Sequence, residues 1–251
     1  TRIELEGETS HRSQPSVPGF SMLGNGVPDA RGIDPRINLN NQTWSQPVVL
    51  DANTGSIRIT HRLETDWTLT AHGATQRLRS DDRVAFPFGV FDPLTFACNP
   101  CDRFASDGTF TLWEFVSDNE GRRTDAFDVW VSGKLTTGAL RHQVQAGLLR
   151  SLFRTTFGQQ TFDIAGSGNI AGTAQTPPSP GSTAANTNRD EQSSELHLRD
   201  AISLDERSTL WLGLRRTSLH RSSIGTDASG ATDYAQTLTA PFLAASAQLS
   251  L

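Results

Sequence analysis

Two cysteines, Cys98 and Cys101, have the spacing that most directly suggests chemistry in this chain of 251 residues. A Cys-x-x-Cys pair can form a redox site, supply half of a zinc site or close a small disulfide. Zinc would need two further ligands, and no histidine lies close to this pair in the sequence. A thioredoxin-like site would need a following helix in a βαβ unit, which the surrounding sequence does not predict. No metal site is therefore expected at these cysteines.

The remaining polar residues show no catalytic pattern. The six histidines are scattered singly along the sequence and lack a ligand spacing such as HExxH. The acidic pairs Asp81–Asp82 and Asp190–Glu191 are typical of solvated charges, and no GxSxG, P-loop or dinucleotide fingerprint is present. A formal net charge of −5 argues against a nucleic-acid partner, which would favour a basic surface. The sequence therefore predicts neither an enzyme nor a resident cofactor.

The stretch from Asp125 to Phe157 reveals the kind of element that must position these residues. It contains two long runs in which side-chain character changes at every second residue, joined by a short polar turn at Thr136–Gly138. In the first run Phe127, Val129 and Val131 alternate with Asp128, Trp130 and Ser132. A period of two places one set on each face of a strand, so this stretch predicts a hairpin with one apolar face and one wet face. The runs exceed the roughly 9–11 residues that a strand needs to cross a bilayer.

Composition agrees with a membrane barrel and disagrees with a helical membrane protein. Hydrophobic residues make up 35% of the chain, and no apolar run approaches the roughly 18 residues of a spanning helix. In a transmembrane barrel only alternate residues meet lipid, so the hydropathy of each strand is modest.

Short turns and long loops alternate along the chain. The short turns lie near Thr65, Thr137 and Glu206 at nearly equal intervals, and they alternate with Pro- and Gly-rich stretches at 13–46, 89–108 and 161–189. Outer-membrane barrels have this asymmetry, with short periplasmic turns and long extracellular loops. Trp67, Trp130 and Trp211 lie near predicted strand ends, and we interpret them as an aromatic girdle at the membrane interface. The predicted fold class is all-β, an antiparallel up-and-down transmembrane β-barrel segment of about eight strands of a larger barrel.

Several stretches resemble a known family. SVPGF (16–20), DPRINLNNQTWSQPVV (34–49) and TGSIRITHRLETDWTLTAHGATQRLRSDDRVAFPFG (54–89) look like early barrel strands of TonB-dependent outer-membrane siderophore receptors. GRRTDAFDVWVSGKLTTGALRHQVQAGLLRS (121–151), NTNRDEQSSELHLRDAISL (186–204) and LWLGLRRTSLHR (210–221) continue the resemblance. No single motif is diagnostic, and the strength of the resemblance lies in many weak matches in the expected order.

The resemblance implies a bacterial outer-membrane protein that binds and imports ferric siderophores. The family has a barrel of about 22 strands with a plug domain in its lumen, and its energy comes from the TonB complex. Residues 1–251 would then be a partial barrel domain, a fragment without the plug and with an incomplete C-terminal part. The implied partners are a ferric siderophore, outer-membrane lipid and, through the missing plug, the TonB complex; iron enters only as part of the bound substrate.

The same resemblance suggests which residues contact ligand. A large, often anionic chelate favours aromatic and arginine side chains on extracellular loops and strand ends. An oxidising exterior and an even cysteine count predict a structural disulfide between Cys98 and Cys101 in the second loop. The candidate ligand contacts are Phe86, Phe88, Phe91, Phe96, Arg103, Phe104, Trp113, Arg122 and Arg123.

Two other functions share parts of this pattern. A passive porin-type channel would show the same alternation but would have no plug. A soluble β-sandwich binding module would use the apolar faces as a core instead of exposing them to lipid.

Overall fold

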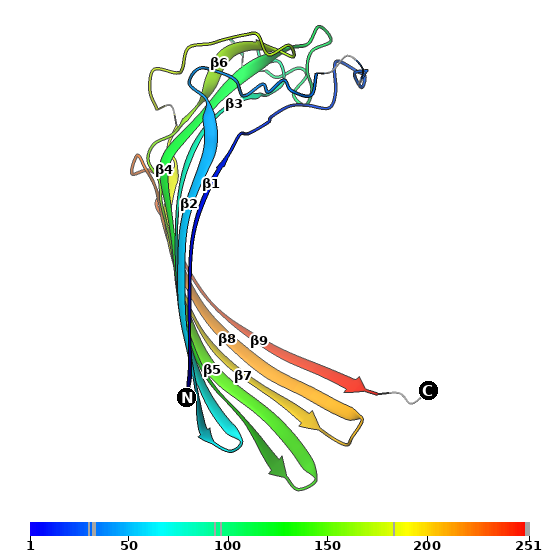
Figure 1. Cartoon of the computed structure of the whole chain (residues 1–251), viewed down its shortest axis with the longest axis vertical. Helices are drawn as coiled ribbons and strands as arrows, with labels where there is room; N and C mark the ends of the chain where they lie inside the picture. Colours follow the sequence, from blue (N-terminus) through cyan, green and yellow to red (C-terminus); the bar gives the residue numbers. More distant parts are fainter. Residues whose placement is uncertain (30, 32–33, 93, 96, 183, 249–251) are drawn as a thin grey trace.

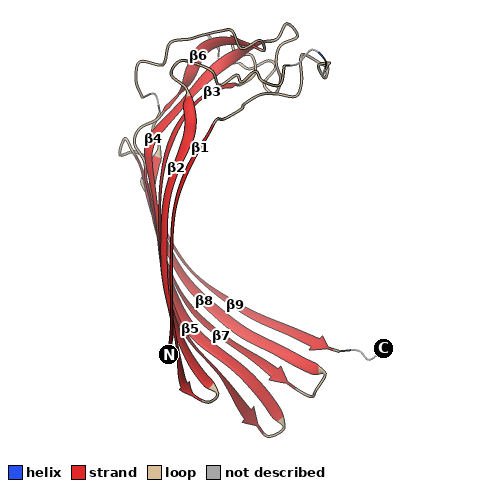
Figure 2. Cartoon of the chain, viewed as in Figure 1, coloured by secondary structure: helices blue, strands red, loops and turns tan. Residues whose placement is uncertain are grey.

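The chain folds as one long antiparallel sheet. The computed structural model describes residues 1–29, 31, 34–92, 94–95, 97–182 and 184–248. Figure 2 shows strands and loops, and among the described residues no helix has the length and apolar content needed to cross a membrane. The described residues form nine strands: β1 (Arg2–Gln14), β2 (Gln46–Glu64), β3 (Trp67–Pro87), β4 (Thr109–Thr137), β5 (Leu140–Thr156), β6 (Thr161–Asn169), β7 (Thr187–Ser203), β8 (Ser208–Gly225) and β9 (Thr232–Ala247).

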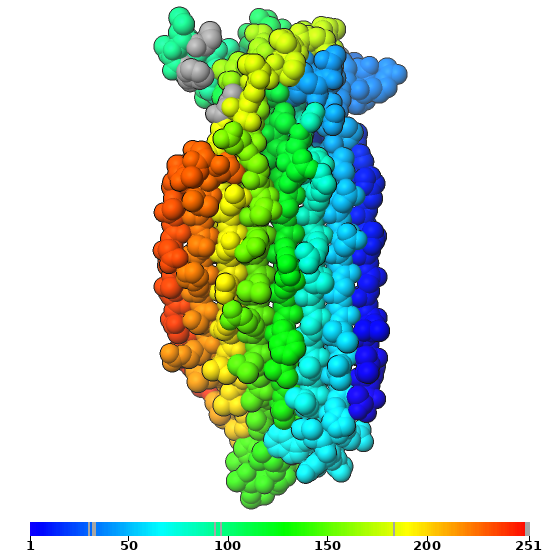
Figure 3. Space-filling model, turned by 90° about the vertical axis from the view of Figure 1, so that its left-hand side faces the viewer, coloured from blue at the N-terminus to red at the C-terminus, as the bar shows by residue number. Residues whose placement is uncertain are grey.

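The strands are arranged up and down, in the order β1-β2-β3-β4-β5-β7-β8-β9, with β6 paired to β4. Every named pair is antiparallel. The strands lie side by side across the surface in Figure 3, and the sheet is curved in Figure 1. Within the described part of the chain β1 and β9 each have one neighbour, so the sheet is open at both edges. The predicted all-β, up-and-down fold is confirmed.

The two-residue alternation of the sequence becomes two chemically different faces. The register places Ile59 opposite Ala71, Ala71 opposite Val129, Val129 opposite Leu148, and Leu148 opposite Leu196. Directly opposed residues of antiparallel strands share a face, so these side chains form an apolar band across five strands. We call this side the apolar face. Its exposed members include Ile3, Leu5, Ile57, Phe127, Leu148, Leu196, Leu198, Leu214 and Leu243.

The opposite side, here called the polar face, carries charged and hydrogen-bonding groups. On it Arg58 lies opposite His72, and His72 lies opposite Asp128. Glu195 pairs with Arg215 across an N–O distance of 3.2 Å. A sheet with an exposed apolar face cannot use that face as the core of a sandwich without a second layer, and the described residues provide no such layer over the band.

The predicted asymmetry between short turns and long loops is confirmed. Residues 65–66, 138–139 and 204–207 make the short connections at one end of the sheet. Residues 15–45, 88–108 and 226–231 connect strands at the other end. The stretch 161–189 differs from the expected loop, because β6 begins at Thr161 and extends the sheet along β4. The described strands therefore number nine and not about eight.

A bend separates the regular sheet from its loop end. The lower half of β4 pairs with β5 from Gly121 onward, while its first residues, up to Val116, pair with β6. The register also shifts between Ser80 and Asp82 of β3 beside this point. Bulges bend strands and increase their twist, and Figure 1 shows the upper parts of β3, β4 and β6 inclined to one side.

Hydrogen bonds and an ion pair between polar side chains stabilise the bend. Glu120 is buried and accepts hydrogen bonds from the hydroxyls of Ser80 (2.9 Å) and Ser117 (2.7 Å). Arg83 and Asp118 form a bidentate ion pair with a closest N–O distance of 2.6 Å. Because these groups are partly removed from water, their pairing fixes the angle between the two parts of the sheet.

Above the bend lies a small hydrophobic core. Leu39, Ala85, Phe104, Phe110 and Leu112 are buried together, with Phe20, Leu23 and Trp44 packed against them. This core joins loop 15–45 and loop 88–108 to the ends of β3 and β4. We refer to these loops, the strand segments above the bend and β6 as the distal region.

Candidate ligand-binding surface

An aromatic cluster in the distal region brings together four of the nine predicted ligand-contact residues, Phe86, Phe88, Phe91 and Trp113. The ring of Phe88 stacks on Phe91 with centroids 5.4 Å apart, and Trp113 meets Phe91 edge-on at 5.2 Å. Phe86 lies 6.2 Å from Phe88. Phe162 of β6 completes the cluster at 5.0 Å from Trp113. These edge-to-face and offset arrangements are the favourable geometries of aromatic pairs.

Two strands and one glycine turn position the cluster. Phe86 lies opposite Trp113 in the β3–β4 ladder, so both rings share a face. The chain then turns at Gly89, whose φ of 66° lies in the left-handed region. A Cβ there would lie 2.3 Å from the carbonyl oxygen of Pro100, so only glycine fits. Thr111 holds the segment, accepting from Phe88 N–H at 3.1 Å and donating its own N–H to Gly89 O at 2.7 Å.

The aromatic cluster has a buried side and a solvent-exposed side. Trp113 is only 8% exposed, and its indole Nε1 has no hydrogen-bond partner among the described residues. Phe88 and Phe162 are 41% and 44% exposed, respectively. Such a surface can stack on planar or apolar parts of a ligand and can attract a cation to its ring faces.

Phe162 was not among the predicted contacts, because it lies in a stretch that the sequence analysis assigned to a loop. Its strand is short and contains Gly166 and Gly168, which weakened the strand signal. The alternation of Phe162 and Ile164 was the available clue. Phe96, also a predicted contact, lies outside the described residues.

Phe104 corrects one prediction. Instead of facing a ligand, it is 8% exposed and packs between Phe20 (5.3 Å) and Phe110 (5.4 Å) in the distal core. Phe104 N–H also donates to Met22 O at 3.1 Å, which ties loop 88–108 to loop 15–45. Its role is therefore structural, because burial between two rings leaves little surface for a ligand.

The three predicted arginines do not converge on the aromatic cluster. Arg103 is held by Asp102 (2.8 Å) and donates to Gly24 O at 3.4 Å. This pairing keeps the pKa of Asp102 below its ordinary value. Arg122 lies at the bend, where it pairs with Glu120 at 2.9 Å and covers the ring of Phe157.

Arg123, also a predicted ligand contact, does not lie on the same face as Arg122. It directly follows Arg122 in β4 and therefore lies on the opposite, apolar face, where it pairs with Asp125 at 2.5 Å.

The cysteine pair also differs from its prediction. Cys98 and Cys101 are free thiols and not a disulfide. Each sulfur instead points at a carbonyl of the same tight turn: Cys101 Sγ donates to Cys98 O at 3.1 Å and Cys98 Sγ to Pro100 O at 3.4 Å. Burial, followed by the neighbouring Cys101 thiol, raises the pKa of Cys98 to about 11. Cys98 is therefore a protonated thiol at neutral pH, which does not favour nucleophilic or metal-ligand chemistry.

The cysteine turn borders a polar hollow of about 710 Å³. Its walls include Gly24, Asn25, Cys98, Cys101 and Arg103. This hollow joins the predicted Arg103 to both cysteines and lies in the distal region, beside the distal core. Among the described residues, no group of three or more His, Cys, Asp or Glu side chains has a metal-binding arrangement.

The predicted tryptophan girdle does not hold for two of its three residues, and for Trp67 it stays a prediction. Trp67 lies on the apolar face directly after the 65–66 turn, opposite Gly133. Trp130 instead lies opposite Gly147 on the polar face, and Trp211 lies opposite Ala201 on that same face. On both strands these tryptophans share a face with the charged side chains, so they cannot contribute to a band on the apolar face.

No protein-family model matches the sequence, and no curated protein gives a significant match. Solved structures do match. BauA, the ferric preacinetobactin receptor of Acinetobacter baumannii, has a TM-score of 0.66 and 17% identity, with 97% of this chain and 34% of that chain covered.

Two further structures give the same result. The closed form of Fiu, the ferric-catecholate import receptor of E. coli K12, has a TM-score of 0.66 and 13% identity over 97% of this chain and 37% of its own. The siderophore receptor PiuA from Acinetobacter baumannii has a TM-score of 0.61 and 14% identity over 97% of this chain and 36% of its own.

The chain spans about a third of the length of these receptors. At such identities the likeness concerns the fold, and the strand order, the two faces and the turn asymmetry described above all agree with it. This chain has the fold of a partial barrel region of TonB-dependent siderophore receptors.

Proposed function

We propose that this chain forms part of the barrel of an outer-membrane, TonB-dependent receptor that binds and imports ferric siderophores. The single observation that supports it best is the pairing of an exposed apolar band with a charged opposite face in a sheet that matches siderophore receptors. In a barrel of this kind the apolar band contacts lipid, and the polar face lines the lumen.

The open edges support a larger assembly. β1 and β9 each pair on one side within the described residues, which leaves a row of backbone donors and acceptors on the other side. In hydrocarbon every backbone group needs a partner, so a spanning sheet must close. Further strands beside β1 and β9 would complete the barrel, and the plug and TonB contact would belong to the same larger protein.

The distal region supplies the ligand surface in this proposal. The exposed rings of Phe88 and Phe162 would contact the organic part of a chelate, and Arg103 beside the polar hollow would attract its negative charge. Iron is cargo here and not a resident cofactor. A role in transport also agrees with the comparison structures, which are receptors and not enzymes.

Binding of ferric siderophores to the full-length receptor that contains this chain tests the proposal. We expect a ferric catecholate to quench tryptophan fluorescence in a saturable way, and Phe88→Ala and Phe162→Ala to weaken binding. The matched control is Phe127→Ala, since Phe127 is exposed on the apolar face, far from the distal loops. If neither cluster variant changes the affinity for any ferric siderophore that the wild type binds, the proposed ligand surface is wrong.

Heat-modifiable migration in detergent tests the barrel itself. A closed barrel should migrate differently before and after boiling, because its hydrogen-bonded ladder resists detergent at room temperature. Identical migration of both samples would contradict the membrane-barrel part of the proposal.

A further inference from the structure

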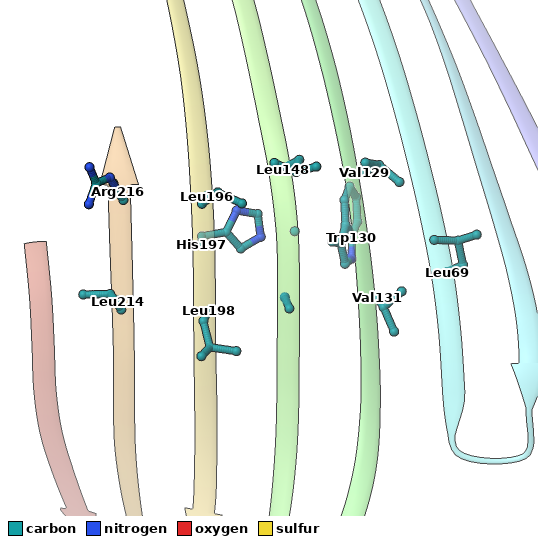
Figure 4. Close-up of a pocket in the computed structure, with 12 residues that line it drawn as sticks. Leu69, Val129, Trp130, Val131, Leu148, Leu196, His197, Leu198, Leu214 and Arg216 are labelled. Carbon is teal, nitrogen blue, oxygen red and sulfur yellow. The ribbon is translucent and has the colours of Figure 1, made fainter. Parts of the chain in front are cut away.

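A hollow in the apolar face lies apart from the distal region and has not been given a role. Its volume is about 550 Å³, within the roughly 300–1,000 Å³ of small-molecule sites. Its lining residues come from five neighbouring strands, β3, β4, β5, β7 and β8. Among them are Leu69, Val131, Leu198 and Leu214 (Figure 4). Ala146 lies between Val131 and Leu198 in the register, and its small side chain leaves the space that larger neighbours enclose.

One arginine lines this hollow, and a second lies on the same face in the adjoining row. Arg216 lies opposite Leu196, one step above Leu214 along β8, and Figure 4 places it at the upper edge of the hollow. Arg150 of β5 lies opposite Ser194, in the adjoining row of the sheet. The hollow therefore has an apolar floor and a cationic upper border.

Neither arginine has an acidic partner among the described residues. Arg150 donates to the neutral Ser194 Oγ (2.9 Å) and Gln192 Oε1 (2.8 Å). Arg216 is exposed and forms no ion pair or side-chain hydrogen bond within the described part of the chain. By contrast, Arg123 and Arg154 on this face are paired with Asp125 and Asp190.

An unpaired guanidinium at the edge of an apolar surface requires an anionic partner when that surface is covered by hydrocarbon. Guanidinium groups bind phosphate oxygens in a bidentate manner, and acidic lipids attract arginines at the membrane boundary. An apolar hollow below the same arginines matches the chain attached to such a headgroup. The charge and the shape of the site thus specify one kind of occupant.

We propose that this hollow binds an anionic phospholipid, with one acyl chain against Ala146 and the phosphate at Arg216. The inference rests on the proposed function, because it takes the apolar face to be the lipid-facing one. It adds a specific lipid site to the barrel surface, separate from the ligand surface in the distal region.

Native mass spectrometry of the full-length receptor that contains this chain, in nonionic detergent micelles, provides the test. The receptor is titrated with dimyristoyl phosphatidylglycerol and with dimyristoyl phosphatidylcholine, which have the same acyl chains and differ in headgroup charge. We expect tighter binding of phosphatidylglycerol. Arg216→Gln should weaken that binding about fivefold, the effect of one arginine at an anionic lipid surface, and should leave phosphatidylcholine binding unchanged.

Two further variants separate the site from general attraction. Arg77→Gln removes another exposed, apolar-face arginine that has no ion pair among the described residues, and it should bind phosphatidylglycerol as the wild type does. Ala146→Leu fills the hollow and should weaken binding of both lipids. Equal binding of the two lipids by the wild type, or an equal loss in Arg77→Gln and Arg216→Gln, would overturn the inference.

Two controls complete the design. Inorganic phosphate should not compete at concentrations where the lipid saturates the site, and competition as effective as that of the lipid would mean that the arginines bind a free anion instead. Heat-modifiable migration is measured on the same samples. A wild-type barrel that migrates as expected but shows no headgroup preference refutes only the lipid site, whereas a wild type without heat-modifiable migration refutes the proposed barrel and this inference together.

Discussion

Gly147 of β5 offers a sharp test of how the two faces of the sheet are packed. A Cβ at this position would lie 2.6 Å from the Cβ of Trp130 and 2.7 Å from the imidazole Cε1 of His197. These neighbours lie directly opposite Gly147 on β4 and β7, so all three share the polar face. The absence of a side chain at Gly147 therefore makes room for two large rings on either side.

Substituting Gly147→Ala should destabilise the folded sheet. Overpacking a fitted site costs about 1–3 kcal/mol, because Trp130 and the backbone must shift. The lower flexibility of alanine in the unfolded chain offsets about 0.4–1 kcal/mol of this. The net loss in the free energy of unfolding is expected at about 1–2 kcal/mol, which is large beside the usual effect of a surface substitution.

Urea unfolding of the full-length receptor in detergent micelles, followed by the loss of the β-sheet signal in circular dichroism, measures this change. Gly55→Ala, in the middle of β2, is the matched control, since the nearest atoms would lie 4.0 Å from the new Cβ. The double variant Gly147→Ala with His197→Ala should show non-additive stability, because removing the imidazole relieves one of the two close contacts. A Gly147→Ala protein at least as stable as the wild type would refute the packing described for the polar face.

Three further outcomes are expected elsewhere in the chain. Gly89→Ala should loosen the aromatic cluster, at a cost of about 1–3 kcal/mol for the local conformation, and should increase proteolysis within 88–108. The pKa of Asp205 lies below its ordinary value of 3.8, because its carboxylate accepts a hydrogen bond from the backbone N–H of Arg207. The stabilising contribution of this carboxylate is therefore complete above pH 3.8. It is lost as the pH falls through the lower pKa of the folded state. At pH 8 the raised pKa of the Cys98 thiol should make alkylation of Cys98 much slower than that of exposed Cys101.

Each of these outcomes has its own control. Gly181→Ala should leave proteolysis unchanged, because nothing lies within 4 Å of its Cβ position. For Asp205, Asp205→Asn should abolish the difference in stability between pH 5 and pH 2 that this turn contributes, and an unchanged difference would contradict its capping role. For the cysteines, a titration of unreduced protein that finds no free thiols would show that the two sulfurs are bonded to each other.

Most of the fold could be predicted from the alternation of apolar and polar side chains. The run from Phe127 to Ser132 and its return in β5 predicted the hairpin, since a period of two is set by the strand itself and needs no distant contact. The short polar turns were recognisable for the same reason. The face of Trp130 is also predictable from the sequence, because Trp130 alternates with the apolar Val129 and Val131. Its position near a strand end favours a girdle, but the alternation places it on the polar face.

The distal region could not be derived in this way. Phe88 and Phe104 are both aromatic residues of one aperiodic loop, yet one is exposed in a cluster with Phe162 and the other is buried against Phe20. That difference depends on β6 lying beside β4 and on loop 15–45 packing against loop 88–108, contacts between residues far apart in the sequence.

The sequence alone thus determined the up-and-down sheet, its two faces and the end that carries the long loops, because each follows from local periodicity and turn chemistry. Only the tertiary structure decided which loop aromatics form a surface, that the cysteines are separate thiols, and that a hollow lies beneath Arg216. These features depend on register and on packing between distant segments, for which local patterns carry no signal.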